Sequence, residues 1–232
     1  CIRDRFTARD KEIGYDESEC ETITLSDNAS TSSLKSVKID GNTITVSEEG
    51  TYIVSGTLSD GQIIIDGDKN EKIRFILDGV TINSNTGAPI YVKQTDKLFI
   101  TLAENSKNVL TNNKQFTADG DNNVDAVIFS KDDITLNGNG SLEITTNCGH
   151  GIVSKDDLKI TSGTYSITSS SHALDGKDSV RIASGTFTLN SDKDGIHSEN
   201  ADDTSLGFIY IAGGTFRITS DGDGMDLSLI HI

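Results

Sequence analysis

Two consecutive segments decide the fold: VDAVIFSKDDITLNGNGSLEITTN at positions 124–147 and CGHGIVSKDDLKITSGTYSITSS at positions 148–170. The quartet SKDD begins at Ser130 and returns 24 positions later at Ser154. Two related units follow at 171–191 and 192–220, and a fifth unit begins at Asp221. The unit at 192–220 is longer because ENADDTSLG, at 199–207, is inserted into it. Such repetition indicates a solenoid in which each unit packs on the next.

Each unit contains three short segments rich in Val, Ile, Leu, Thr and Tyr, separated by Gly, Asn, Asp or Ser. These are the composition and spacing of strands and turns. In LKIT, at 158–161, apolar residues alternate with the charged Lys159, as expected for a strand with one buried face. We therefore predict an all-β fold: a right-handed, single-stranded parallel β-helix with about 22–24 residues per coil.

Three parts of the chain are distinguished by pattern. Residues 1–20 are charged and aperiodic, and we expect them to be disordered or of artefactual origin. Residues 21–226 form the predicted β-helix domain, truncated at its C-terminus, with a polar insertion at 111–123. Residues 227–232 break the pattern and resemble an adapter-derived tail. Cys20 and Cys148 are a potential disulfide pair that nothing in the sequence demands.

The net charge of −16 argues against nucleic acid as a partner, because a phosphate backbone would be repelled. No stretch of 18 apolar residues is present, so no transmembrane helix is expected in this segment. The absence of Trp and the 6% aromatic content argue against a stacking platform for a neutral glucan. We expect a monomer outside the cell or on its surface.

Aligning the units places acidic residues at one corner of successive coils. One row contains His150, His172, Asp194 and Asp223, and Asp125 lies in the coil before it. A second row contains Val153, Asp175, His197 and Asp226, and a third contains Cys148, Ser170, Asp192 and Asp221. Stacked carboxylates repel one another unless a cation binds, and Ca²⁺ prefers such oxygen ligands. The alternative is that these residues only stabilise turns.

The segment DGDNNVD contributes a second candidate, with Asp119, Asp121 and Asp125 at alternating positions. It resembles the start of an EF-hand loop, but Val124 occupies the glycine position and Ser130 replaces the closing glutamate. The predicted Ca²⁺ ligands are therefore Asp119, Asp121, Asp125, Asp175, Asp192, Asp194, Asp221, Asp223 and Asp226.

No catalytic residue is predicted. Gly149–His150–Gly151 resembles the Gly-His-Gly signature of polygalacturonase-type hydrolases, but the Asn-Thr-Asp triplet of those enzymes is absent. We interpret His150 as a turn residue. A calcium-dependent pectate lyase would also need a basic residue as proton acceptor, and nothing assigns that role to Arg181 or Arg217. Lyase activity and a purely structural or adhesive solenoid are kept as alternatives.

Several motifs occur in an order that resembles a bacterial β-helix family of carbohydrate-binding domain-containing proteins. They are FILDGVTINSNTGAPIYVKQTDKLFITL, GIVSKDDLKIT, LDGKDSV and DGIHSEN, within residues 40–226. The resemblance implies a pectate-lyase-like fold, Ca²⁺ binding, association with polygalacturonate or cellulose, and a secreted protein or lipoprotein. It also implies that the acidic corner binds Ca²⁺. The expected function is binding of an acidic plant polysaccharide through that Ca²⁺.

Overall fold

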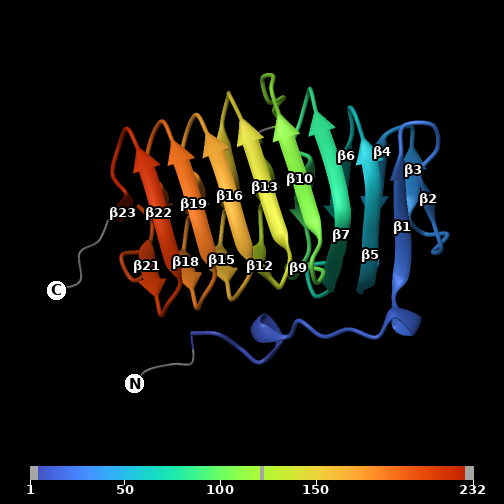
Figure 1. Ribbon diagram of the computed structural model, residues 1–232, viewed down its shortest axis with the longest axis horizontal. Coiled ribbons are helices and arrows are strands. Elements are labelled where there is room, and N and C mark those ends of the chain that lie inside the picture. The colour runs from blue at the N-terminus through green and yellow to red at the C-terminus, as the bar shows by residue number, and fades with distance from the viewer. Residues whose placement is uncertain (1–4, 121–122, 228–232) are drawn as a thin grey trace.

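The repeating units form a parallel β-solenoid of about seven turns. The computed structural model describes residues 5–120 and 123–227. The coils stack side by side along the long axis of the molecule (Figure 1). The predicted all-β parallel architecture is confirmed, because strands one coil apart pair in parallel from β4 to β23.

Each complete coil has three strands, one on each side of the solenoid. The first side is a nine-stranded sheet. Its strands are β3 (Lys38–Asp40), β4 (Thr43–Val46), β6 (Gln62–Asp66), β8 (Ile90–Gln94), β11 (Ala126–Ser130), β14 (His150–Ser154), β17 (Leu174–Gly176), β20 (Ile196–Ser198) and β23 (Met225–Leu227).

The long strand β7 (Lys72–Ser84) continues from the second side into the third, so these two sides form one sheet. The second side also has β9 (Lys97–Leu102), β12 (Asp133–Gly138), β15 (Asp157–Ile160), β18 (Ser179–Ile182) and β21 (Phe208–Ile211). The third side also has β10 (Lys107–Asn112), β13 (Ser141–Thr146), β16 (Thr164–Ser169), β19 (Thr186–Ser191) and β22 (Thr215–Ser220). Strand β5 (Gly50–Leu58) pairs with β1 (Glu21–Ser26) and β7.

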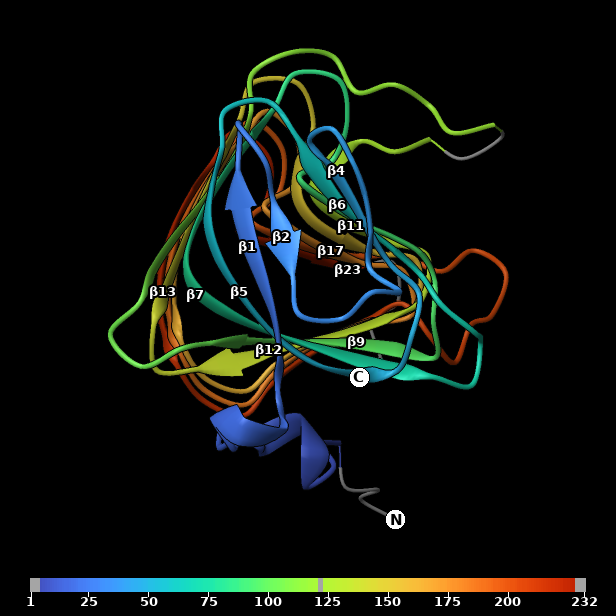
Figure 2. The same cartoon turned by 90° about the vertical axis from the view of Figure 1, so that its right-hand side faces the viewer.

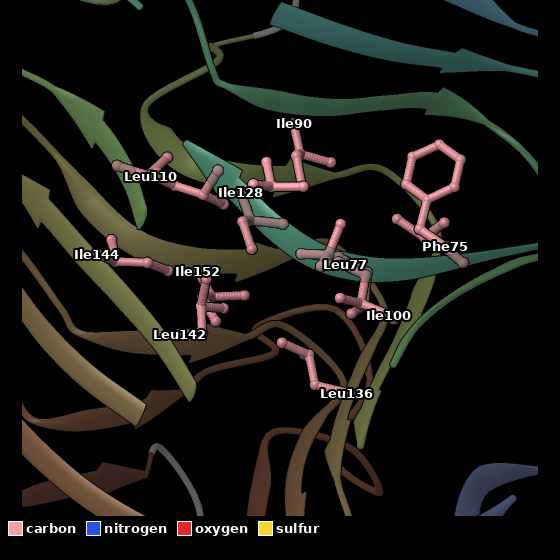
Figure 3. Close-up of a cluster of buried hydrophobic side chains, with 14 of the residues drawn as sticks. Phe75, Leu77, Ile90, Ile100, Leu110, Ile128, Leu136, Leu142, Ile144 and Ile152 are labelled. Atoms are coloured by element: carbon pink, nitrogen blue, oxygen red, sulfur yellow. The ribbon is translucent and has the colours of Figure 1, made fainter. Parts of the chain in front are cut away.

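Apolar residues from all three sides fill the interior as ladders with one residue per coil (Figure 3). The register brings Tyr165, Phe187 and Phe216 together on β16, β19 and β22. Their rings stack with centroid distances of 5.2 and 4.7 Å and interplanar angles of 11° and 4°. Because each ladder extends through adjacent coils, the position of every coil depends on that of its neighbours.

Gly138 ends β12 where the chain turns from the second side to the third. Its φ is +114°, and a Cβ atom there would lie 2.2 Å from the carbonyl oxygen of Leu102. Only glycine satisfies both the left-handed backbone and the close approach of the neighbouring coil.

The N-terminal end of the solenoid is covered by antiparallel pairing. Strand β2 (Thr31–Ser32) pairs with β1, and β3 pairs with β4, both in antiparallel register. These short strands break the parallel pattern, which limits further pairing at that end.

Residues 5–20 differ from the predicted disorder. They form an extended segment with two 3₁₀ turns, Arg9–Lys11 and Glu17–Glu19, that lies beneath β9 and β12 (Figure 2). Asp10 is fully buried, and its Oδ1 accepts hydrogen bonds from Lys97 Nζ (2.7 Å) and Thr135 Oγ1 (3.0 Å). Arg74 donates to the carbonyl oxygens of Glu12 and Gly14. The charged and aperiodic composition resembles that of a disordered segment. The contacts that order the segment were not apparent from the sequence, because the partner residues are distant in the chain. We call residues 5–20 the N-terminal strap.

Other expectations concern the loops and termini. The insertion after β10 joins the third side to the nine-stranded sheet, and residues 199–207 form the connection between β20 and β21. Residues 228–232 of the expected tail lie outside the described residues, whereas Leu227 pairs with Ser198. Cys20 and Cys148 both have free thiols. Nowhere in the described ranges is a helix long and apolar enough to span a membrane.

Candidate functional site

The outer face of the nine-stranded sheet carries two rows of side chains along the solenoid axis. The strand register fixes the first row as Tyr91, Phe129, Val153, Asp175, His197 and Asp226. The second row contains Ala126, His150, His172, Asp194 and Asp223. Strand pairing aligns Ala126 with His150. From His150 onward, the backbone N–H of the residue after each member donates to the carbonyl oxygen of the member one coil further on. Sequence alignment of the units predicted the last members of both rows in this register.

The two rows change character halfway along the sheet. Over β8 and β11 they are apolar, and Tyr91, Ala126 and Phe129 belong to a small buried cluster separate from the main core. From β14 onward they consist of His and Asp, apart from Val153. The polar half of this outer face is the candidate functional site.

Three histidines from adjacent coils stack at the centre of the site. The ring centroids of His150 and His172 are 5.1 Å apart, and those of His172 and His197 are 4.2 Å apart with an interplanar angle of 12°. His172 and His197 stand in different rows, and the two rings nevertheless stack across the face. At such distances two imidazolium charges would repel, so the arrangement favours at least one neutral ring.

Two aspartates hold the histidine rings. His197 Nδ1 lies 3.0 Å from Asp175 Oδ1. His172 Nδ1 lies 2.9 Å from Asp194 Oδ2 and also accepts the backbone N–H of Asp194 at 3.2 Å. The nitrogen cannot both accept that N–H and donate a proton to the carboxylate. When it accepts the N–H, two lone-pair-bearing atoms face each other, which is a geometry that a bound cation stabilises.

Burial and these contacts separate the pKa values of the groups. Burial lowers the pKa of His150 to about 4 and also lowers that of His172. The hydrogen bond to Asp175 raises the pKa of His197. Burial acts to raise the pKa of Asp175, but the hydrogen bond from His197 and the charges of the neighbouring histidines outweigh it, so the pKa is lowered. At neutral pH the face therefore combines neutral imidazoles with an ionised carboxylate.

Two atoms at the edge of the site have no hydrogen-bond partner among the described residues, although they are inaccessible to solvent. They are His150 Nδ1 and Asp125 Oδ1. Asp125 Oδ2 lies 3.9 Å from His150 Nε2, and Asp175 Oδ2 lies 4.0 Å from His150 Nδ1. Unpaired buried polar atoms are rare, and in native proteins they often mark the position of a ligand or ion.

His172, Asp194 and His197 form a group that can hold a metal ion. One ligand atom from each residue lies within 4.8 Å of the others. Two imidazole nitrogens and one carboxylate oxygen suit Zn²⁺ and similar ions, whereas Ca²⁺ prefers oxygen ligands throughout. The histidines themselves therefore do not fit Ca²⁺. The carboxylates of Asp194, Asp223 and Asp226 do offer the hard oxygen donors that Ca²⁺ requires.

Seven of the nine predicted Ca²⁺ ligands divide into three sets. Asp175, Asp194 and Asp226 lie on the outer face, and Asp223 joins them because its N–H donates to Asp194 Oδ1 at 2.8 Å. Asp192 and Asp221 lie in the turns before β20 and β23 and are exposed. Asp125 is one position out of the histidine row, because Ala126 pairs with His150. As metal ligands, all of these residues stay a prediction.

Asp119 lies elsewhere on the same sheet, against β8. Its Oδ2 contacts Lys93 Nζ at 2.9 Å and accepts a hydrogen bond from the Tyr91 hydroxyl at 3.1 Å. Asp121 falls outside the described residues. The grouping of Asp119 with Asp121 as metal ligands therefore stays a prediction.

Sequence reasoning missed His172 and His197 as potential ligands. It included the histidines in the aligned rows but named only aspartates as metal ligands. The signal was present in the alignment, since His172 and His197 each stand one coil from an aspartate of the same row. Imidazole is itself a common metal ligand.

Comparison with known proteins gives consistent results. Residues 40–229 match the family described as carbohydrate-binding domain-containing protein. A protein of that description from Acetivibrio thermocellus is 37% identical over 143 residues, which cover 61% of this chain and 50% of the relative. The chain thus spans about half the length of this curated relative.

A solved structure has the same architecture. It is described as the polysaccharide lyase-like protein from C. thermocellum, gadolinium derivative, and it superposes with a TM-score of 0.84 at 30% identity. The match covers 90% of this chain and 95% of the other. Since the family match spans more than half of the chain, the protein belongs to the family of carbohydrate-binding domain-containing proteins.

Proposed function

We propose that the protein binds an acidic polysaccharide of the polygalacturonate type along the outer face of the nine-stranded sheet, outside the cell or on its surface. The observation that carries the proposal is the open face on which Asp175, Asp194, Asp223 and Asp226 lie on three adjacent coils. A carbohydrate-binding family and an elongated polar face both suit a long polymer.

A divalent cation would overcome the electrostatic repulsion between the acidic protein and an acidic polysaccharide. The protein has a net charge of −16, so a polyuronate would be repelled overall. Ca²⁺ held by Asp194, Asp223 and Asp226 would coordinate carboxylates of the protein and the polymer together. The solved relative was obtained as a gadolinium derivative, and Gd³⁺ is a hard cation that, like Ca²⁺, prefers oxygen ligands.

The test is calorimetric titration of polygalacturonate into chelator-treated protein, with and without added Ca²⁺. We expect binding that depends on Ca²⁺ and that is lost in the variant Asp194→Asn/Asp223→Asn. The matched control is Asp40→Asn/Asp78→Asn, which removes two exposed carboxylates remote from the site. This control should bind like the wild type.

The same samples distinguish a binding module from an enzyme. Ultraviolet absorbance detects the unsaturated sugar that a lyase releases. Binding without such a product supports the binding module, whereas product formation would make the protein a lyase. Absence of binding in both conditions would refute the proposed function.

A further inference from the structure

Four consecutive coils place a lysine at the same position beside the candidate site. Each directly follows one of four residues that are in register on the nine-stranded sheet, namely Val92, Ser130, Ser154 and Gly176. The lysines are Lys93, Lys131, Lys155 and Lys177, which we call the lysine row. Because adjacent strands lie ~4.8 Å apart, the row is a ladder of cations along the solenoid axis.

The backbone holds the lysine row in place. The N–H groups of Lys131, Lys155 and Lys177 donate to carbonyl oxygens one coil away, at 3.2, 2.9 and 2.9 Å. The corresponding positions in the flanking coils are acidic, namely Asp66 and Glu199. The row is thus limited to the four central coils of the sheet.

The side chains of Lys93 and Lys155 extend across the outer face of the sheet. Lys93 Nζ lies 5.6 Å from the ring centroid of Tyr91, and Lys155 Nζ lies 5.3 Å from that of Phe129. Both rings belong to the first outward row. These cation–π contacts hold the ammonium groups next to the apolar half of the face and the histidine site.

The middle of the row differs from its ends in forming no ion pair among the described residues. Lys93 and Lys177, at its ends, pair with Asp119 (2.9 Å) and Asp202 (3.0 Å). Lys131 and Lys155 are exposed, and neither forms an ion pair within residues 5–120 and 123–227. Adjacent like charges disfavour the free protein, and a bound polyanion would relieve that repulsion.

Two of the aspartates that follow the lysines in sequence make other contacts. Asp132 Oδ2 accepts the N–H of Thr95 at 3.0 Å, and Asp178 Oδ1 accepts a hydrogen bond from Asn200 at 2.7 Å. The carboxylate of Asp156, which follows Lys155, accepts no hydrogen bond from a described residue and forms no ion pair with Lys155. Lys131 and Lys155 thus remain exposed to a ligand.

A hollow of about 380 Å³ joins the lysine row to the histidine site. Its lining includes Lys155, Lys177, Asp175 and His197, together with Glu199 and Asp202. Ammonium groups, carboxylates and an imidazole therefore converge on one concavity, as in sites that fix a polar ligand.

We propose that the lysine row binds the carboxylate groups of a polyuronate chain directly, without a bridging metal. The polymer lies parallel to the solenoid axis, with its carboxylates facing successive coils. Both the lysine row and the polymer carry charge at regular intervals along one axis, so more than one carboxylate can meet an ammonium group at once. This inference rests on the proposed function and adds a second, metal-independent mode of recognition at the same face.

The test compares the double variant Lys131→Gln/Lys155→Gln with the control Lys35→Gln/Lys107→Gln. Both change the net charge equally, and the control lysines are exposed and lie outside the row. Polygalacturonate binding is measured with Ca²⁺ and in chelator, at two salt concentrations. We expect the row variant to bind about tenfold more weakly than the wild type in both conditions. Its affinity should also depend less on salt.

A neutral probe sharpens the test. Methyl-esterified polygalacturonate lacks the carboxylate charge, so the wild type and the row variant should bind it equally weakly. Circular dichroism and thermal unfolding of the variants establish that the solenoid is intact. The control variant should retain wild-type affinity for the unesterified polymer.

Each outcome has a separate meaning. If the wild type binds polygalacturonate and the row variant binds it equally well, the lysine row is not a subsite, and the proposed function stands. If both lysine variants lose affinity equally, only net charge matters and the inference is overturned. If the wild type binds no polygalacturonate in either condition, the proposed function and the inference fail together.

Discussion

Two sides of the solenoid carry rows of charged residues on their outer faces, and the two rows differ in their ion pairs. On the second side the charges form a closed network: Lys159 Nζ lies 3.1 Å from Asp157, and Arg181 Nη2 lies 3.1 Å from the same carboxylate. The N-terminal strap runs along this face, from the contact of Glu12 with Arg74 on β7 to that of Phe6 with Tyr210 on β21, and adds Asp10. On the nine-stranded sheet, by contrast, two lysines form no ion pair in the described part of the chain. Buried atoms without a hydrogen-bond partner occur on both sides, as His150 Nδ1 and Asp125 Oδ1 on this sheet and as Arg181 Nε on the second side, so the difference lies in the ion pairs.

The difference separates charges that stabilise the fold from charges available to a ligand. Both faces carry charged residues that recur from coil to coil, so the repeat alone does not distinguish them. Where the chain supplies its own counter-charges, the ladder is structural. Where it leaves cations and imidazoles open beside a hollow, binding is the better explanation.

The largest expected effect concerns the closed face. Asp10→Ala leaves Lys97 buried without its partner, and we expect a loss of about 3 kcal/mol in the free energy of unfolding, measured by urea denaturation. Limited proteolysis should then cleave within the strap. The control Glu19→Gln alters an exposed residue of the same segment and should change neither measurement.

The same contact has a defined pH dependence. Burial acts to raise the pKa of Asp10, but the hydrogen bonds from Lys97, Thr7 and Thr135 outweigh it and lower the pKa to about 2. The stabilisation is therefore complete above pH about 4 and is lost as pH falls from about 4 to 2. Asp10→Asn should remove this acid-dependent loss, and an unchanged acid transition would show that Asp10 does not titrate in this contact.

The second effect concerns the open face. We expect Zn²⁺ to raise the unfolding temperature of chelator-treated protein, because a ligand at 100 times its Kd stabilises by about 2.7 kcal/mol. His172→Asn/His197→Asn should abolish the Zn²⁺ effect and leave any effect of Ca²⁺ on the carboxylates intact. Equal Zn²⁺ responses in this variant and the wild type would exclude the histidines as ligands.

Sequence reasoning predicted the structural features that follow directly from the repeat. The three strands per coil, and the rows that bring Asp175, His197 and Asp226 together, follow from the register of the units. The N-terminal strap was not predictable in this way, because Asp10 meets Lys97 and Thr135 across 87 and 125 positions of sequence. Ring stacking of His172 on His197 was missed as well, because it depends on side-chain directions rather than on register.

The lysine row shows a different limit. SKDD was recognised as a repeat marker, yet its lysine was not considered as a binding residue because the net charge directed attention to acids. A total charge says nothing about the arrangement of the minority sign. Only the strand register shows that Lys131 and Lys155 are neighbours, and only the contacts show that neither forms an ion pair with a described residue.

The smallest expected effect lies at the corner between the two faces. Asp156 stands one coil from Asp132 and from Asp178, and its own carboxylate accepts no hydrogen bond from any described residue. Burial, followed by repulsion from Asp133, Asp178 and Asp132, raises its pKa to about 6. The charged form is thus disfavoured in the folded protein, and stability falls as pH rises from about 4 to 6.

Asp156→Asn should therefore stabilise the protein at pH 7, by about 1 kcal/mol after allowance for solvent screening of this partly exposed group. The gain should disappear below pH 4, where Asp156 is protonated in both the folded and unfolded states. Urea denaturation at pH 7 and pH 4 measures it, with Asp40→Asn as an exposed control. A gain that persists at pH 4 would mean that side-chain packing, not charge repulsion, limits stability at this corner. A gain confined to neutral pH would show that the corner beside the lysine row holds more negative charge than the fold itself favours.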